Sequence, residues 1–100
     1  MNIRICGIPY RLKYEDVIDE NEEGIICGKI IPSKNIIKLK KGMTTESERE
    51  VLIHEMVHGI LNHLGKSELS CDEEFVQLMA NAIYNHFEIR DDIYEEVDDE

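Results

Sequence analysis

The segment that decides the fold is TESEREVLIHEMVHGILNHL, residues 45–64. Its apolar residues recur at spacings of three and four, which predicts an amphipathic helix over about residues 46–64. Thr45 and Glu48 have the Thr-x-x-Glu spacing of a capping box at the start of this helix. The chain is therefore expected to contain one long helix that buries a wide apolar face.

A second helix is expected after a polar connection. Apolar residues at helical spacing between Val76 and Phe87 predict a helix over about residues 72–89, and either Ser70 or Asp72 can cap its start. Two helices of this length need a partner layer, because each has an apolar face to bury.

Strand patterns precede both helices. Ile3–Cys6 is apolar, and Tyr10–Tyr14 alternates apolar and basic residues as a half-buried strand does. Residues 15–23 are acidic and fit either a short helical turn or a loop.

The isoleucine-rich region that follows predicts a β-hairpin. Pro32–Asn35 has turn chemistry and separates the arms Ile25–Ile31 and Ile36–Leu39. The fold class is therefore expected to be α+β, with a small antiparallel or mixed sheet and an N-terminal hairpin packed on two main helices, about 46–64 and 72–89.

Length and charge limit the function classes. The chain has 100 residues and a net charge of −11, so we expect one domain over residues 1–90 and no nucleic-acid partner. Residues 91–100 carry seven acids and are expected to form a flexible tail. No segment has the length or composition of a membrane span or a secretory signal, and the three cysteines suit reduced thiols, which together predict a cytoplasmic protein without a membrane partner.

The long helix contains the sequence His-Glu-Met-Val-His, residues 54–58. Residues four apart differ by about 40° in rotation around a helix, so the imidazoles of His54 and His58 can converge on one metal ion. Glu55 lies beside them, where its carboxylate can accept a proton from water. This arrangement is typical of zinc hydrolases.

A hydrolytic zinc site needs a third protein ligand and one open position. We favour Glu73, which shares a face of the second helix with Val76 and Ala80; Glu74 is the alternative if that helix starts in another register. Asp72 is expected to act either as an N-cap or as a partner that orients a ligand imidazole. His63 lies about 140° around the helix from His58 and is expected at the surface.

These residues resemble a known family. The segment from Thr45 to Leu61 with its His-Glu-x-x-His motif, followed by Glu73, Val76, Met79 and Ala80, looks like the small zincin metallopeptidase-like proteins of phages and mobile elements, which are relatives of the ImmA/IrrE-type gluzincins. The similarity extends over about residues 24–87.

The resemblance implies a minimal zincin-like domain with metallopeptidase activity, in which His54, His58 and Glu73 bind one Zn²⁺ ion and Glu55 is the general base. It also implies a protein or peptide substrate, with transcriptional regulators among the expected targets. In related enzymes a strand edge receives the substrate, which makes Ile36–Leu39 the candidate edge. A residue that stabilises the oxyanion is not evident, because Tyr84 and His86 are more typical of core and surface positions.

Two other functions remain open. The chain could be a zinc-stabilised binding or regulatory module that keeps the zincin scaffold with little or no catalysis. Alternatively, the acidic tail could bind a basic protein, although such tails more often only increase solubility.

Overall fold

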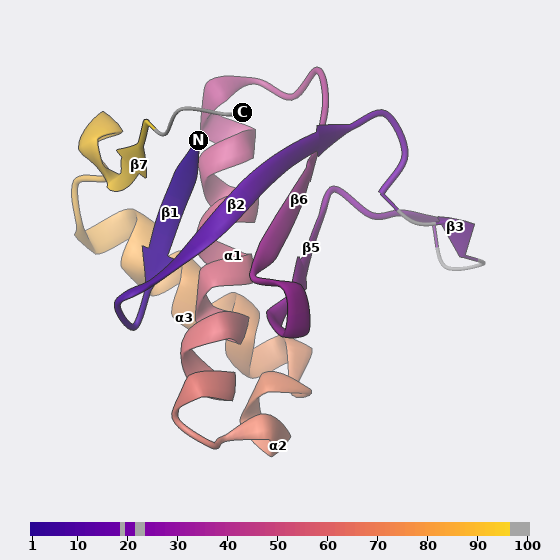
Figure 1. Cartoon of the computed structure of the whole chain (residues 1–100). Coiled ribbons are helices and arrows are strands. Elements are labelled where there is room, and N and C mark those ends of the chain that lie inside the picture. Colours follow the sequence, from indigo (N-terminus) through magenta and orange to yellow (C-terminus); the bar gives the residue numbers. More distant parts are fainter. Residues whose placement is uncertain (19, 22–23, 97–100) are drawn as a thin grey trace.

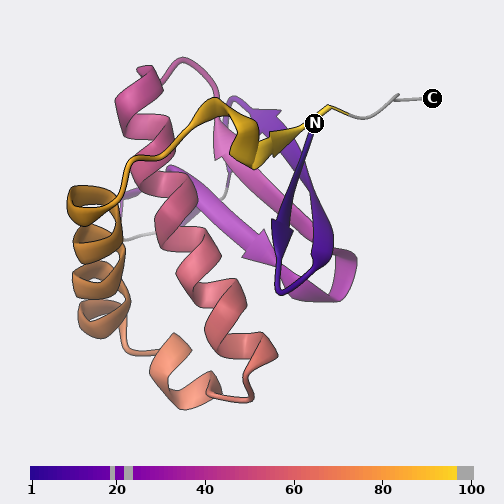
Figure 2. The ribbon, with the colours of Figure 1, turned by 90° about the vertical axis from the view of Figure 1, so that its left-hand side faces the viewer.

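A mixed five-stranded sheet packs on one side of a long helix, α1, and a second long helix, α3, packs on the other side in the computed structural model (Figures 1 and 2). The structure describes residues 1–18, 20–21 and 24–96. The sheet has the order β5-β6-β2-β1-β7, with β1 Asn2–Ile5, β2 Ile8–Glu15, β5 Gly28–Ile31, β6 Ile36–Lys40 and β7 Tyr94–Glu95. The other elements are β3 Glu20–Asn21, β4 Gly24–Ile25, η1 Pro32–Lys34, α1 Thr45–His63, α2 Ser67–Ser70, α3 Glu73–His86 and η2 Asp91–Ile93.

The α+β prediction is confirmed, and α1 begins and ends within one residue of the predicted helix. Its cap lies one residue earlier than predicted. Thr44 has an extended backbone, and its side-chain oxygen accepts a hydrogen bond from the Ser47 N–H at 3.1 Å, so Thr44 rather than Thr45 caps the helix.

The second helix, α3, starts where the sequence places it. Asp72 is the N-cap, and its Oδ1 accepts a hydrogen bond from the Phe75 N–H at 3.1 Å. The helix ends at His86, three residues before the predicted end, because Phe87 adopts an extended backbone. The connection between the long helices contains the one-turn helix α2, which the sequence analysis does not predict.

The N-terminal hairpin β1–β2 closes through a two-residue turn. Cys6 and Gly7 both have positive φ angles, 50° and 80°, as a type I′ turn requires. The predicted alternation along β2 is confirmed, because Tyr10 and Leu12 are buried and the basic residues between them are exposed.

The predicted hairpin is also present, since β5 and β6 pair antiparallel. However, β6 is not an edge strand, because β2 pairs with it in parallel on its other side. The prediction of Ile36–Leu39 as a substrate edge is therefore wrong, and β5 occupies the end of the sheet. The residues described between 15 and 25 form the end of β2 and the β3–β4 pair, rather than a helical turn.

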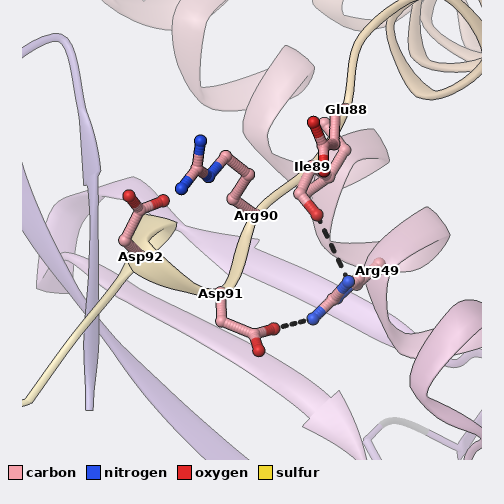
Figure 3. A pocket seen from close by; sticks show the side chains of 6 residues that line it. All are labelled: Arg49, Glu88, Ile89, Arg90, Asp91 and Asp92. Atoms are coloured by element: carbon pink, nitrogen blue, oxygen red, sulfur yellow. Dashed lines mark hydrogen bonds and ion pairs between the residues drawn. The ribbon is translucent and has the colours of Figure 1, made fainter.

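The segment after α3 is folded as far as it is described. Residues 91–95 form η2 and β7, and β7 pairs with β1 at the far edge of the sheet. Arg49 of α1 holds this segment by donating a hydrogen bond to the Ile89 carbonyl at 3.2 Å and pairing with Asp91 (Figure 3). The expected flexible tail therefore does not begin at residue 91, and residues 97–100 lie outside the described part.

Two apolar clusters lie on opposite sides of α1. The larger cluster lies between α1 and the sheet, with the buried residues Ile3, Ile5, Tyr10, Leu12, Ile37, Leu39 and Leu52. The smaller cluster lies between α1 and α3, with the buried residues Ile53, Val57, Val76 and Ala80. Burial of both faces explains the wide apolar stripe of α1, and no helix among the described residues is long and apolar enough to cross a membrane.

Gly28 lets β5 lie close to α1. A Cβ atom at this position would lie 2.4 Å from Cγ1 of Val51, far below a normal contact. We therefore expect Gly28→Ala to lower the free energy of unfolding by about 1–3 kcal/mol, because either the strand or the helix must shift. Urea unfolding measures this change. The Val51→Ala background provides the control, since removing Cγ1 should reduce the cost of Gly28→Ala; an equal cost in both backgrounds would contradict this contact as the cause.

Candidate metal centre

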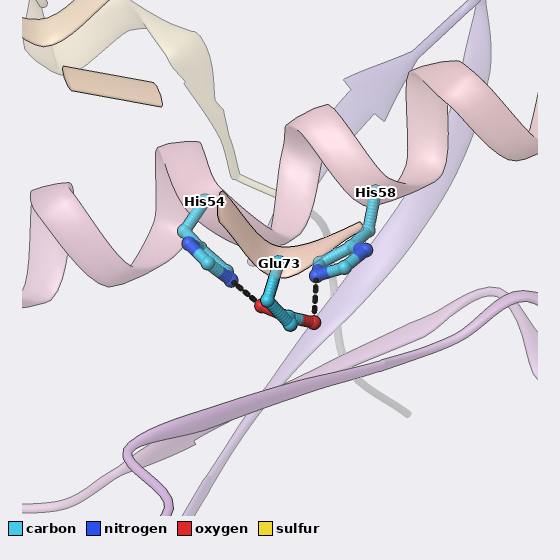
Figure 4. A group of neighbouring side chains, drawn as sticks. All are labelled: His54, His58 and Glu73. Carbon is cyan, nitrogen blue, oxygen red and sulfur yellow. Dashed lines mark hydrogen bonds and ion pairs between the residues drawn. The ribbon is translucent and has the colours of Figure 1, made fainter. Parts of the chain in front are cut away.

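The imidazoles of His54 and His58 lie one turn apart on the same face of α1, with ring centroids 5.0 Å apart. Glu73, in the first turn of α3, reaches both of them (Figure 4). One Glu73 oxygen lies 3.1 Å from His54 Nε2, and the other lies 3.1 Å from His58 Nε2. Packing of α1 against α3 thus brings together three side chains that are up to 19 residues apart in sequence.

These three residues form the group of potential metal ligands among the described residues, and their ligand atoms all lie within 4.8 Å of one another. Glu74, the alternative third ligand, is exposed in the same turn of α3 and lies outside this group. The side chain of Glu73 is 68% exposed, whereas those of His54 and His58 are 19% and 13% exposed. The group is therefore open to solvent on the side of the carboxylate.

The Nδ1 atom of His54 has a partner on α3. It lies 2.9 Å from Oε1 of Gln77, while Nε2 of Gln77 donates a hydrogen bond to Asn81 Oδ1 at 2.8 Å. Because the amide oxygen of Gln77 faces the ring, it accepts from His54 Nδ1–H. This tautomer leaves Nε2 of His54 with its lone pair, the atom that faces Glu73.

The Nδ1 atom of His58 is held in the same way from α2. It lies 3.0 Å from Oγ of the buried residue Ser70, whose hydroxyl donates to the His58 carbonyl oxygen at 3.5 Å. The hydroxyl proton is thus engaged elsewhere, so Ser70 Oγ accepts from His58 Nδ1–H. Both imidazoles consequently present an unprotonated Nε2 to the same point.

The donor set suits a zinc ion. Two imidazole nitrogens and one carboxylate form one of the ligand sets of catalytic zinc sites, with metal–ligand bonds of about 2.0–2.2 Å. Such bonds place neighbouring ligand atoms about 3.3 Å apart in a tetrahedral site, close to the separations of 3.1 Å between Glu73 and each imidazole. The group can therefore hold a metal ion with small side-chain movements.

Glu55 lies beside this group but is buried, with 8% of its surface exposed. Burial raises the pKa of its carboxyl to about 7, and the charge of Glu73 raises it further, whereas His54 and a hydrogen bond from the Ile30 backbone lower it. Burial also lowers the pKa of His58, and the Glu73 carboxylate opposes this effect. The site thus contains a carboxyl group poised to exchange a proton near neutral pH.

The raised pKa predicts a pH-dependent stability of the metal-free chain. Glu55 has an ordinary pKa of 4.5 when unfolded and about 7 when folded, so the folded state is stabilised below pH 4.5 and loses this stabilisation as the pH rises through 7. The loss is on the order of 3 kcal/mol.

Urea unfolding between pH 4.5 and pH 8 measures this effect. Glu55→Gln removes the titrating group, so the metal-free variant should become more stable than the metal-free wild type above pH 7. The two proteins share the titration of His58, which therefore cancels in the comparison. Parallel stability curves across this pH range would refute the assignment.

The remaining candidate residues lie elsewhere. His63 is exposed, as expected, and its Nε2 lies 2.9 Å from the hydroxyl of the buried Tyr10. Tyr84 packs in the cluster between α1 and α3, and His86 contacts the carbonyl of Ala82. None of these residues is part of the potential ligand group within the described residues.

The sequence analysis missed Gln77 and Ser70. Gln77 follows Glu73 by four residues, which places both on one face of α3, so helical spacing could have identified it. Ser70 gives no such signal, because its contact with His58 depends on α2. Asp72, considered as an orienting partner, is the N-cap.

Comparisons with protein-family models, with curated proteins and with solved structures found no match to this chain. The site is therefore interpreted from its own residues.

Proposed function

We propose that the chain is a zinc-dependent peptidase with His54, His58 and Glu73 as metal ligands and Glu55 as general base. The observation that carries this proposal is the convergence of two unprotonated Nε2 atoms and a carboxylate next to a buried glutamate. A site with a structural role alone has no use for an open position or for a proton acceptor beside the ligands.

When bound, a zinc ion supplies a Lewis acid that lowers the pKa of water and polarises a carbonyl group. The chain itself supplies proton transfer. Glu55 accepts a proton from the attacking water and returns it to the leaving amine, and a pKa of about 7 suits both steps near neutral pH. Gln77 and Ser70 keep the two imidazoles in the tautomer that binds metal through Nε2.

Strand β5 is the candidate edge for an extended substrate. The Lys40 N–H donates to the Cys27 carbonyl, so the backbone groups of alternate residues, Gly28 and Ile30, face away from β6. Glu55 accepts a hydrogen bond from one of these groups, the N–H of Ile30. A peptide added to this edge would therefore run next to the proposed general base.

Digestion of a peptide library derived from a whole proteome tests the proposal. The zinc-loaded chain should generate new N-termini within a narrow set of sequences, and removal of zinc should abolish them. A library that stays intact with zinc bound would contradict peptidase activity and favour the alternative, a zinc-stabilised binding or regulatory module. The exposed Glu73 ligand is compatible with that alternative, because a partner side chain could approach the ion there.

A further inference from the structure

The positive charge of this acidic chain is concentrated on its sheet. Residues 1–14 and 24–41 contain no Asp or Glu and eight of the 11 Lys and Arg residues, namely Arg4, Arg11, Lys13, Lys29, Lys34, Lys38, Lys40 and Lys41. Helices α1 and α3 cover one face of the sheet region, and the other face is free of helices (Figures 1 and 2). Because Ile37 and Leu39 of β6 are buried against α1, Lys38 and Lys40 between and beside them lie on the open face.

Three lysines form a row across this open face, which we call the lysine row: Lys29, Lys38 and Lys13. Lys38 lies directly opposite Lys29 on β5 and directly opposite Lys13 on β2. Side chains that face each other in this way are about 5 Å apart, and like charges there are destabilising. Glu15 offsets part of this repulsion through an ion pair with Lys38 at 3.2 Å.

The lysine row ends at β5, the strand whose outward backbone groups lie next to Glu55. A lysine on an edge strand often protects that edge from unwanted pairing. Such protection requires a charge on β5 alone, whereas here the charges continue onto β6 and β2. An acidic side chain on an added strand, directly opposite Lys29, would continue the row with the opposite sign and relieve the repulsion.

The next row specifies a second position. Ile31 of β5 and Ile36 of β6 lie opposite each other on the same open face. An added strand that runs antiparallel to β5, the more stable pairing, meets Ile31 first, then Ile30, then Lys29. Its preferred sequence is therefore an apolar residue, any residue and an acidic residue, with the central side chain on the side of α1.

We propose that β5 and the lysine row select extended peptide segments with the pattern apolar-x-acidic. The proposal rests on the proposed peptidase function only in treating this segment as the substrate. A polypeptide fits better than a nucleic acid for two reasons. The edge of β5 offers backbone hydrogen bonds that only another strand can complete, and the net charge of −11 repels a phosphate backbone at long range.

Fluorescence polarisation with the metal-free full chain tests the proposal, because nothing is cleaved under these conditions. The probes are three fluorescein-labelled octapeptides that carry Val-Thr-Glu, Val-Thr-Gln or Val-Thr-Lys at their centre. The glutamate peptide should bind about fivefold more tightly than the lysine peptide. Equal affinities, or no saturable binding up to millimolar chain, would overturn the proposal.

Charge reversal at Lys29 locates the selection. Lys29→Glu should reverse the preference, so that the lysine peptide binds most tightly, and Lys29→Gln should remove the preference. Lys34→Glu is the matched control, because Lys34 lies in η1 outside the lysine row and the change in net charge is the same. If Lys34→Glu reverses the preference as Lys29→Glu does, bulk charge is responsible and the proposal fails.

Two further results separate the possible explanations. A duplex oligonucleotide that binds more tightly than the glutamate peptide, and that Lys29→Glu displaces, would overturn the proposal in favour of a nucleic-acid surface. A glutamate preference in the binding assay without library cleavage would contradict the peptidase function and leave the surface intact. Cleavage without any preference for acidic residues would do the reverse.

Discussion

The Glu55→Gln variant is expected to bind zinc as the wild-type chain does and to hydrolyse peptides about 10²- to 10⁴-fold more slowly. Glutamine has the shape of glutamate and can still accept the hydrogen bond from the Ile30 N–H, but it cannot accept a proton from water. The three proposed ligands are unchanged in this variant. The effect should therefore appear in kcat, with little change in zinc content.

The measurement combines zinc analysis with turnover of a peptide identified in the library digestion. Glu50→Gln is the matched control, because Glu50 lies on the same helix and is exposed. It should retain both zinc and activity. Turnover by Glu55→Gln at the wild-type rate, with zinc bound, would show that this carboxylate is not the general base.

Zinc affinity is expected to fall by more than about 100-fold in Glu73→Ala. Loss of a partner that only orients a ligand costs about 10- to 100-fold in metal affinity, and loss of a ligand should cost more. Glu73 is the contact of the group from α3, at 3.1 Å from each imidazole nitrogen. Without it, two imidazoles on one helix must hold the ion.

Competition with a chromophoric chelator measures these affinities. Glu74→Ala is the matched control, since it removes the same charge from the same turn and should leave the affinity within a few-fold of wild type. Gln77→Ala should fall between the two, because it loses the partner of His54 Nδ1 but no ligand. A larger loss in Glu74→Ala than in Glu73→Ala would exchange the roles of these residues.

Local signals predicted the elements that carry the site. The apolar spacing of α1 and the caps of the helices depend on residues close in sequence, and the errors there are small: Thr44 replaces Thr45 as the cap, and α3 ends at His86. The convergence of His54 with His58 follows from helical geometry alone. Glu73 was accessible for a related reason, because it lies on the face of α3 that packs against α1.

Strand order was not accessible in the same way. The lysines of β6 suggested an exposed edge, but they lie on the open face of the sheet, and the strand itself is enclosed by β5 and β2. The parallel pairing of β2 with β6 joins segments more than 20 residues apart and depends on the whole sheet. Likewise, Ser70 reaches His58 only because α2 turns the chain back toward α1.

The position of α1 between two unequal clusters links metal supply to folding. The cluster under the sheet contains seven buried residues, whereas the one that attaches α3 contains four. An ion held by His54, His58 and Glu73 would join α1 to α3, and at 100 times its dissociation constant it would add about 2.7 kcal/mol to the stability of the folded state. Zinc starvation would thus first loosen α3, and a cell could control the lifetime of this chain through its zinc concentration.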